Sequence, residues 1–229
     1  NLESHIDVHH AGTAMRFLTA LLAIKTNKKF VITGSKRMKE RPIKILVQAL
    51  NKLGANISYF DKKGFPPLII KGQEIFGGEI SLSSNISSQY ISALMLIAPI
   101  LKNGLLINLE GKITSKPYLE MTLAILKKIG INCYFKNNII SIEHCSKINN
   151  SAISIESDWS SVSYFYSIVA LSNAAELNIG TFYKSSIQGD VKLYEIYAKL
   201  GVETKFIKSS SRILIKKIND FIKPDHIDL

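Results

Sequence analysis

Four short polar segments of the sequence contain the residue types that bind small anions. They are residues 9–13 (His-His-Ala-Gly-Thr), 37–42 (Arg-Met-Lys-Glu-Arg-Pro), 87–89 (Ser-Ser-Gln) and 114–117 (Thr-Ser-Lys-Pro). Each lies beside an apolar pattern with helical spacing, so unpaired N–H groups and the positive end of a helix dipole would face an anion there. The pattern predicts sites for phosphate or carboxylate groups.

The residues of these segments offer different contacts to an anion. Gly12 would let an anion approach the backbone closely, and Arg41 offers a planar pair of donors that matches a phosphate or a carboxylate. Ser87, Ser88 and Ser115 add hydroxyl donors. Two structural alternatives stay open, because serines also cap helices and an arginine before a proline can be a solvated surface residue.

Other polar residues have simpler structural interpretations. Tyr118 fits either core packing or a ligand contact. His9 and His10 could form a metal pair, but adjacent side chains point apart and no third ligand lies near in sequence, so no metal site is predicted. Glu156 and Asp158 are more typical of an acidic helix start than of acid–base catalysis.

One order of features occurs three times along the chain. Each repeat is expected to hold a helix that opens near a hydroxyl residue, a strand, a polar loop, a second helix that ends in glycine, and two more strands. The expected helices span 13–24 and 42–53, then 88–101 and 117–129, then 161–171 and 191–200, and the strands between them span 30–33, 105–109 and 177–179.

One period relates the landmarks of these repeats. Hydroxyl residues are expected to cap helices, prolines to occupy first helical turns, and glycines to end helices in the left-handed conformation. The separations are 75 residues from Thr13 to Ser88, 73 from Ser88 to Ser161, 75 from Pro42 to Pro117, 76 from Gly54 to Gly130 and 71 from Gly130 to Gly201.

The repeat predicts an α/β (α+β) fold built from βαβαββ units of about 75 residues. A polar stretch at residues 146–154 predicts a domain boundary, with residues 1–153 before it and 154–229 after it. The helix at 91–101 is apolar nearly all round and is expected in the interior, as are the aromatic residues 164–166.

Composition and charge limit the possible functions. The chain has 229 residues, of which 46% are hydrophobic and 21% charged, so a disordered chain is excluded. No membrane span, signal peptide, disulfide scaffold or nucleophile motif is found, and a cytoplasmic location is expected. The net charge of +11 would attract nucleic acid, acidic lipid or small phosphorylated metabolites. The lysines, however, are scattered at turns, as in ordinary solvation.

The motifs as a set resemble the EPSP synthase (3-phosphoshikimate 1-carboxyvinyltransferase) family of enolpyruvyl transferases. The match is collinear and covers essentially the whole chain. It rests on residues 11–16 (Ala-Gly-Thr-Ala-Met-Arg), 37–43 (Arg-Met-Lys-Glu-Arg-Pro-Ile), 87–90 (Ser-Ser-Gln-Tyr), 115–118 (Ser-Lys-Pro-Tyr) and 188–190 (Gln-Gly-Asp). The string at 37–42 is specific to this family within the enolpyruvyl transferases.

The resemblance implies a fold and a reaction. The family fold is an inside-out α/β barrel of two similar domains, each of three βαβαββ units. Residues 1–153 would supply two units of the first, substrate-binding domain and residues 154–229 the first unit of the second. The implied reaction transfers the enolpyruvyl group of phosphoenolpyruvate to the 5-hydroxyl of shikimate 3-phosphate and releases phosphate, without a metal or an organic cofactor.

The resemblance also assigns residues and leaves gaps. Family contacts to phosphoenolpyruvate fall on Gly12 and Arg41, and contacts to shikimate 3-phosphate fall on Ser87, Ser88, Gln89 and Ser115, with Tyr118 nearby. The family's Lys-Ser motif would lie before Asn1 and its catalytic residues after Leu229, so no catalytic residue is expected in this chain and the chain alone is expected to be inactive. His10 replaces the usual Asn of the Asn-Ala-Gly-Thr motif.

Two other functions remain as alternatives. One is a basic α/β module that binds nucleic acid through a stripe of lysines, which would give a steep dependence on salt. The other is the related transferase that acts on UDP-N-acetylglucosamine, which lacks the string at 37–42. The favoured interpretation is an incomplete EPSP synthase whose partners are its two anionic substrates, with no nucleic acid or membrane, and which is a monomer when complete.

Overall fold

Three small sheets with a shared strand order form the framework of the computed structural model, which describes residues 3–113, 115–148, 152–219 and 221. The orders are β1-β2-β4-β3, β5-β6-β8-β7 and β9-β11-β10. The first two sheets each contain one parallel pair, β1 with β2 and β5 with β6, and the other neighbouring strands of all three sheets are antiparallel. The strands are β1 (Glu3–Asp7), β2 (Lys29–Thr33), β3 (Asn56–Tyr59), β4 (Leu68–Lys71), β5 (Gly78–Ser83), β6 (Leu105–Glu110), β7 (Cys133–Lys136), β8 (Ile139–Ile142), β9 (Glu176–Gly180), β10 (Val202–Ile207) and β11 (Arg212–Lys217).

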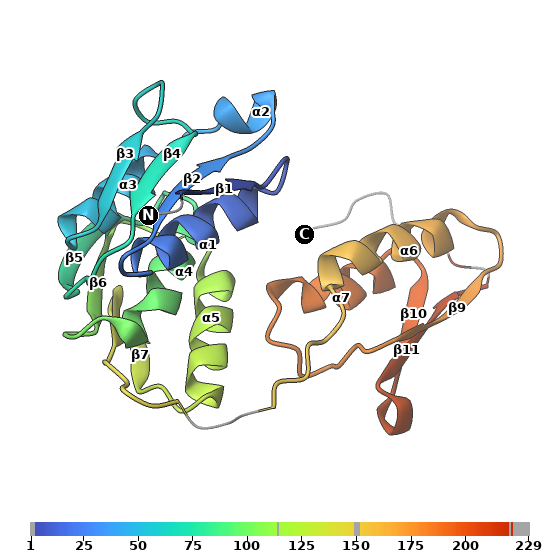
Figure 1. Cartoon of the computed structure of the whole chain (residues 1–229). Helices are drawn as coiled ribbons and strands as arrows, with labels where there is room; N and C mark the ends of the chain where they lie inside the picture. The colour runs from blue at the N-terminus through green and yellow to red at the C-terminus, as the bar shows by residue number, and fades with distance from the viewer. Residues whose placement is uncertain (1–2, 114, 149–151, 220, 222–229) are drawn as a thin grey trace. The chain divides into compact units, whose positions relative to one another are not determined.

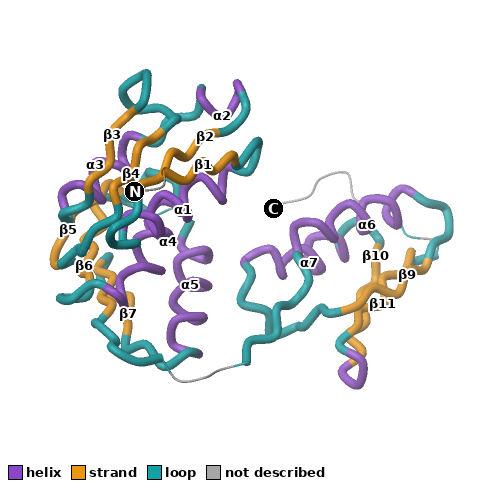
Figure 2. The backbone as a smooth tube through the Cα atoms, in the orientation of Figure 1, coloured by secondary structure: helices purple, strands orange, loops and turns teal. Residues whose placement is uncertain are grey.

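Helices connect the strands of every sheet (Figures 1 and 2). Within the described ranges, no helix is long and apolar enough to cross a membrane. The helices are α1 (Gly12–Ala23), α2 (Lys36–Lys39), α3 (Lys44–Lys52), α4 (Ser88–Ile97), α5 (Lys116–Lys128), α6 (Trp159–Leu171) and α7 (Leu193–Ala198), with 3-10 turns at η1 (Ala98–Ile100), η2 (Gly189–Lys192) and η3 (Lys208–Ser210).

The strand register reproduces the period found in the sequence. Glu3 pairs with Lys29 at the start of the first parallel pair, and Gly78 pairs with Leu105 at the start of the second. The two pairs are thus offset by 75 and 76 residues. The third sheet repeats the order of the last three strands of the others, and residues 152–158 before α6 form no strand. The predicted α/β fold of repeated βαβαββ units is confirmed.

The chain forms two compact units, Asn1–Ser151 and Ala152–Leu229. In the first unit, α4 packs against both α1 and α5, and its side chains are buried on all sides except near Leu96. The hydroxyls of Ser92 on α4 and Thr122 on α5 form a buried hydrogen bond of 3.0 Å, and Thr122 also donates to the Tyr118 carbonyl. The predicted interior helix is confirmed.

The second unit has its own core around the single tryptophan. Trp159 is fully buried and meets Phe182 edge to face, with ring centroids 5.0 Å apart. Helices α6 and α7 lie on one face of the three-stranded sheet (Figure 2). The prediction that residues 164–166 face the interior is wrong for two of them, because Tyr164 is 74% and Phe165 46% exposed while Tyr166 is buried. Three consecutive positions span most of a helical turn, so one sheet cannot bury them all.

The predicted ends of the helices agree with the structure more closely than the predicted starts. Gly54 and Gly130 follow α3 and α5 with φ of 105° and 89°, in the left-handed region that glycine adopts without a side-chain clash. Pro117 lies in the first turn of α5, but α3 begins only at Lys44, so Pro42 precedes its helix. The polar loop that was expected between the strand at 30–33 and the helix at 42–53 contains the short helix α2.

The predicted hydroxyl caps are wrong. Thr13, Ser88 and Ser161 all lie inside their helices, and the residues at the N-caps of α1 and α4 make no side-chain capping bond. Helix α6 is capped instead by Asp158, whose Oδ1 accepts from the Ser160 N–H at 3.0 Å. Its Oδ2 accepts from the Ser161 hydroxyl, and this bond is the main reason that the pKa of Asp158 is lowered.

We predict that Asp158→Ala lowers the free energy of unfolding of the second unit by about 1 kcal/mol at pH 7. Because the pKa of Asp158 is lowered by folding, its contribution is complete above the ordinary carboxyl value of 3.8 and is lost as pH falls through the folded value. Urea unfolding followed by Trp159 fluorescence at pH 7 and pH 3 measures this. Asp158→Asn is the control, because it retains a capping oxygen without the charge. An Ala–wild-type difference that does not shrink in acid would contradict the assignment.

Candidate anion-binding site

Two guanidinium groups lie against Gly12 in the first turn of α1. A Cβ atom added to Gly12 would lie 2.5 Å from Nη1 of Arg16 and nearer still to Nη1 of Arg41. Arg16 is one helical turn after Gly12, whereas Arg41 comes from the segment between α2 and α3. The absence of a side chain at Gly12 is therefore what lets the two cations come to the start of α1.

Arg16 is buried, and no described residue gives it an anionic partner. It is 8% exposed, its Nε atom has no hydrogen-bond partner in the part of the chain that the structure describes, and its Cζ atom lies 5.6 Å from the centroid of the Tyr90 ring. A cation over an aromatic face gains some electrostatic stabilisation, but this does not replace the lost hydration of a guanidinium group. The arrangement favours an anion at this position, because an anion would supply the missing charge and hydrogen-bond acceptors.

The segment that carries Arg41 is held in place by two neighbours. The Tyr90 hydroxyl on α4 donates to the Pro42 carbonyl at 2.6 Å, and the Arg41 N–H donates to the Met38 carbonyl at 3.1 Å. Met38 itself is 2% exposed, so it anchors α2 in the core. Arg41 thus extends from a fixed backbone, although its own side chain is exposed.

A cavity of about 430 Å³ is lined by Arg41 together with His10, Arg37 and Met38. Its volume is in the range of small-molecule sites. Within the part of the chain that the structure describes, no carboxylate forms an ion pair with Arg16, Arg37 or Arg41, and the ion pairs found there join lysines to glutamates. The cavity therefore carries an excess of positive charge.

The first turns of α1 and α4 are joined directly. Nε2 of Gln89 donates to Oγ1 of Thr13 at 3.1 Å, next to Gly12. Ser87 occupies the N-cap position of α4 and Ser88 its first residue, and neither hydroxyl makes a hydrogen bond to a described residue. Gln89 thus lies near Gly12 and Arg41, and the two serines precede it on the same turn.

Ser115 and Tyr118 lie at the start of the next helix, α5. Ser115 is at the N-cap position with no side-chain capping bond, and Tyr118 is 50% exposed. Core packing, one of the two interpretations of Tyr118 from the sequence, is therefore excluded. No hydrogen bond or cation–π contact among described residues links either side chain to Arg16, Arg37 or Arg41, and Thr114, in the same predicted segment, is outside the described residues.

Two arginines of this site, Arg16 and Arg37, were not predicted individually as anion ligands, although Arg37 lies in the predicted anion-binding segment 37–42. Arg16 carries a signal that could have found it, because it is the single charged residue of α1 and follows Gly12 by four positions, which places both on one helix face. Arg37 has no such signal, since it is one of several cations in a segment that was expected to be a loop.

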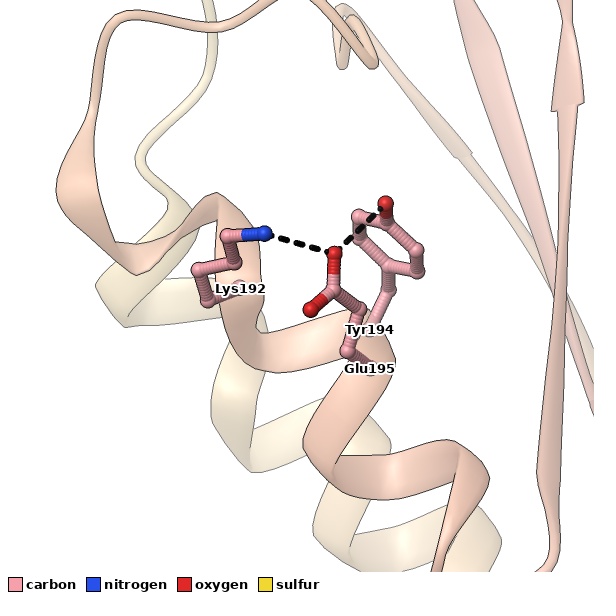
Figure 3. Close-up of polar contacts among 3 residues, drawn as sticks. All are labelled: Lys192, Tyr194 and Glu195. Carbon is pink, nitrogen blue, oxygen red and sulfur yellow. Dashed lines mark hydrogen bonds and ion pairs between the residues drawn. The ribbon is translucent and has the colours of Figure 1, made fainter. Parts of the chain in front are cut away.

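A second polar cluster, on described residues of the second unit, is a surface group rather than a comparable site. Lys192 and Tyr194 both converge on the Glu195 carboxylate, at 2.8 and 3.0 Å (Figure 3), and they lower the pKa of Glu195. All three lie around α7 at the surface, where such pairs contribute little. Among the described residues, no group of three or more His, Cys, Asp or Glu side chains could hold a metal ion.

A sequence model of the family described as EPSP synthase (3-phosphoshikimate 1-carboxyvinyltransferase) matches residues 2–228. Among curated relatives, a protein of that name from Bacteroides fragilis (strain YCH46) is 45% identical over 208 residues, and one from Buchnera aphidicola subsp. Cinara cedri is 41% identical over 211 residues. Each alignment covers 91% of this chain but only 50% and 47% of the relative. The chain thus spans about half the length of the curated relatives it matches.

A solved structure has the same fold. "EPSP synthase from Acinetobacter baumannii" superposes with a TM-score of 0.69 at 22% identity, over 94% of this chain and 48% of that chain. At this identity the likeness concerns the fold. It supports the repeated α/β architecture and again extends over half of the longer protein.

We predict that Gly12→Ala weakens binding of inorganic phosphate about tenfold or more, because the new methyl group displaces the hydrogen-bonding ends of Arg16 and Arg41. Since the displaced atoms end flexible side chains, the free energy of unfolding should change by less than about 1 kcal/mol. Titration calorimetry and thermal unfolding measure the two effects. Gly180→Ala is the control, because nothing lies within 4 Å of its added Cβ. Unchanged phosphate affinity in Gly12→Ala would contradict the site.

Proposed function

The chain belongs to the EPSP synthase family, and on this basis we propose that it forms part of a site for enolpyruvyl transfer. The proposed reaction moves the enolpyruvyl group of phosphoenolpyruvate to the 5-hydroxyl of shikimate 3-phosphate and releases phosphate, a step of the shikimate pathway to aromatic amino acids. The observation that carries the proposal is the pair of guanidinium groups against Gly12, one of which also lines a cavity with no carboxylate among its described lining residues.

Phosphoenolpyruvate is proposed to bind at Gly12 and Arg41. Its phosphate and carboxylate groups are the anions that a planar guanidinium group contacts through two parallel hydrogen bonds. The guanidinium group of Arg16 lies against the same glycine, and we add Arg16 to the proposed site because its buried charge has no anionic partner among the described residues. The same cations would stabilise the phosphate as it leaves.

Shikimate 3-phosphate is proposed to bind at the starts of α4 and α5. Ser87, Ser88, Gln89 and Ser115 offer hydroxyl and amide donors, with Tyr118 nearby. The bond from Gln89 to Thr13 supports a shared location for the two substrates, because it joins the first turn of α4 to the turn that contains Gly12. Both substrates, the enolpyruvyl donor and its acceptor, would then be oriented within one positive region.

The chemistry needs proton transfers as well as anion binding. The methylene carbon of phosphoenolpyruvate must gain a proton so that C2 becomes electrophilic, and the 5-hydroxyl must lose its proton as its oxygen bonds to C2. Loss of a proton from the methyl group of the tetrahedral adduct then re-forms the double bond as phosphate departs. The residues of this chain would bind, orient and neutralise negative charge, and we propose that the acid–base groups lie outside this chain, which alone would not turn over.

We propose the further properties of the chain on the same basis. Residues 1–153 would hold two units of the substrate-binding domain, and residues 154–229 the first unit of a second domain. The complete protein would act as a cytoplasmic monomer, without a cofactor and without nucleic-acid or membrane partners. The clustering of arginines at one cavity supports small anions rather than nucleic acid, since the latter calls for an extended stripe of cations.

We predict that shikimate 3-phosphate binds the wild-type chain in the millimolar range or tighter, and that Ser88→Ala weakens this binding about tenfold through loss of a hydrogen bond to a charged ligand. Arg41→Ala should weaken binding as well, because it removes positive charge from the same region. Titration calorimetry measures all three. Ser58→Ala, an exposed serine on β3, is the matched control and should bind like wild type. The absence of heat from wild type, or equal binding by all variants, would refute the proposal.

A further inference from the structure

The loop that carries His10 is held firmly against the loop after β2. The Ser35 N–H donates to the His9 carbonyl at 3.1 Å, and the His9 N–H donates to Oδ1 of Asp7 at 2.7 Å. Gly34 permits this approach, because a Cβ atom there would lie 2.6 Å from the His9 carbonyl oxygen. His9 has a φ of 48°, which fixes a tight turn just before His10.

The Ser35 side chain orients the imidazole of His10. Oγ of Ser35 lies 2.8 Å from Nδ1 of His10 and also accepts from the Met38 N–H at 3.3 Å. With one lone pair of Oγ used by Met38, its hydroxyl hydrogen is available to neutral Nδ1, and its second lone pair is available when Nδ1 is protonated. Nε2 of His10 carries a hydrogen when a neutral ring accepts from Ser35 through Nδ1, and also when both ring nitrogens are protonated, and in these two states it can donate.

The surroundings of His10 are cationic. It lines the cavity together with Arg37 and Arg41, and the His9 ring meets it edge to face at 4.0 Å between centroids. The carboxylate of Asp7 is engaged by the His9 backbone. Among the described residues, no acceptor of a hydrogen bond from Nε2 is found, so a bound anion would be its natural partner.

We propose that His10 is an additional anion-binding residue of this cavity, that it contacts a phosphoryl group, and that Ser35 is its positioning residue. The inference rests on the proposed function and extends it to a residue in which this chain departs from the family motif. The motif has Asn at this position, and the amide of Asn is a shorter side chain than the imidazole of His10. The cavity would then present the imidazole of His10 to an anion in addition to the guanidinium groups of Arg37 and Arg41.

The test is a titration of the full 229-residue chain with two probes, phosphoenolpyruvate and inorganic phosphate. His10→Ala is expected to raise the dissociation constant about tenfold for both, because a donor to a charged group is lost. In ¹⁵N spectra of histidine-labelled chain, the Nε2 signal of His10 should shift with the same dissociation constant. A weakening restricted to phosphoenolpyruvate would overturn the phosphoryl contact in favour of the carboxylate.

The controls separate a contact from a general effect of charge. His9→Asn removes the neighbouring imidazole while Asn tolerates the left-handed backbone, so it should bind both probes like wild type. Ser35→Ala should weaken binding about threefold and change the Nδ1 signal of His10, whereas Ser35→Thr should restore both. Equal weakening by the His9 and His10 variants would overturn the proposal.

A final variant separates this inference from the proposed function. If Arg41→Ala abolishes binding of both probes while His10→Ala binds like wild type, the role of His10 is refuted and the anion site stands. If the wild-type chain binds neither probe, both are refuted.

Discussion

A buried guanidinium group with no anionic partner among the described residues is the feature on which the site depends. Removing the charge of Arg16 from water costs free energy, and the Tyr90 ring recovers only part of it. The surrounding structure keeps this arrangement rather than relaxing it, because Met15 before it and Thr19 after it on α1 are buried in the core of the first unit. The fold thus maintains a positive charge that an anion can neutralise.

The repeat explains how several such donors reach one place. In the first two units the first helix follows the first strand of a parallel pair, so the starts of α1 and α4 occupy equivalent positions in adjacent units. Packing of α1 against α4 brings them together, and the bond from Gln89 to Thr13 marks the junction. The segments before the second helices differ between the units. The segment before α3 contains α2, and this segment brings Arg37 and Arg41 to the same cavity.

Periodic features were predictable from the sequence, whereas features set by three-dimensional neighbours were not. The glycines Gly54 and Gly130 predicted helix ends because a left-handed residue has a local cause. The caps failed because serines next to an apolar run also serve as first-turn residues, and at α6 the acidic Asp158 caps the helix instead. Gly12 and Arg41 were predicted as anion ligands from residue chemistry, but their approach to Arg16 depends on how α2 folds back, which spacing alone does not encode.

The most direct test of the account is the effect of Arg16→Met on stability with and without ligand. Methionine retains the apolar contacts and removes the unpaired buried charge, so the variant should unfold at a higher temperature than wild type when no anion is present. Phosphoenolpyruvate should raise the unfolding temperature of wild type more than that of the variant, because a ligand stabilises the native state according to its affinity and the variant lacks one of the cations of the site. A variant that is less stable than wild type, or that is stabilised equally by phosphoenolpyruvate, would contradict the account.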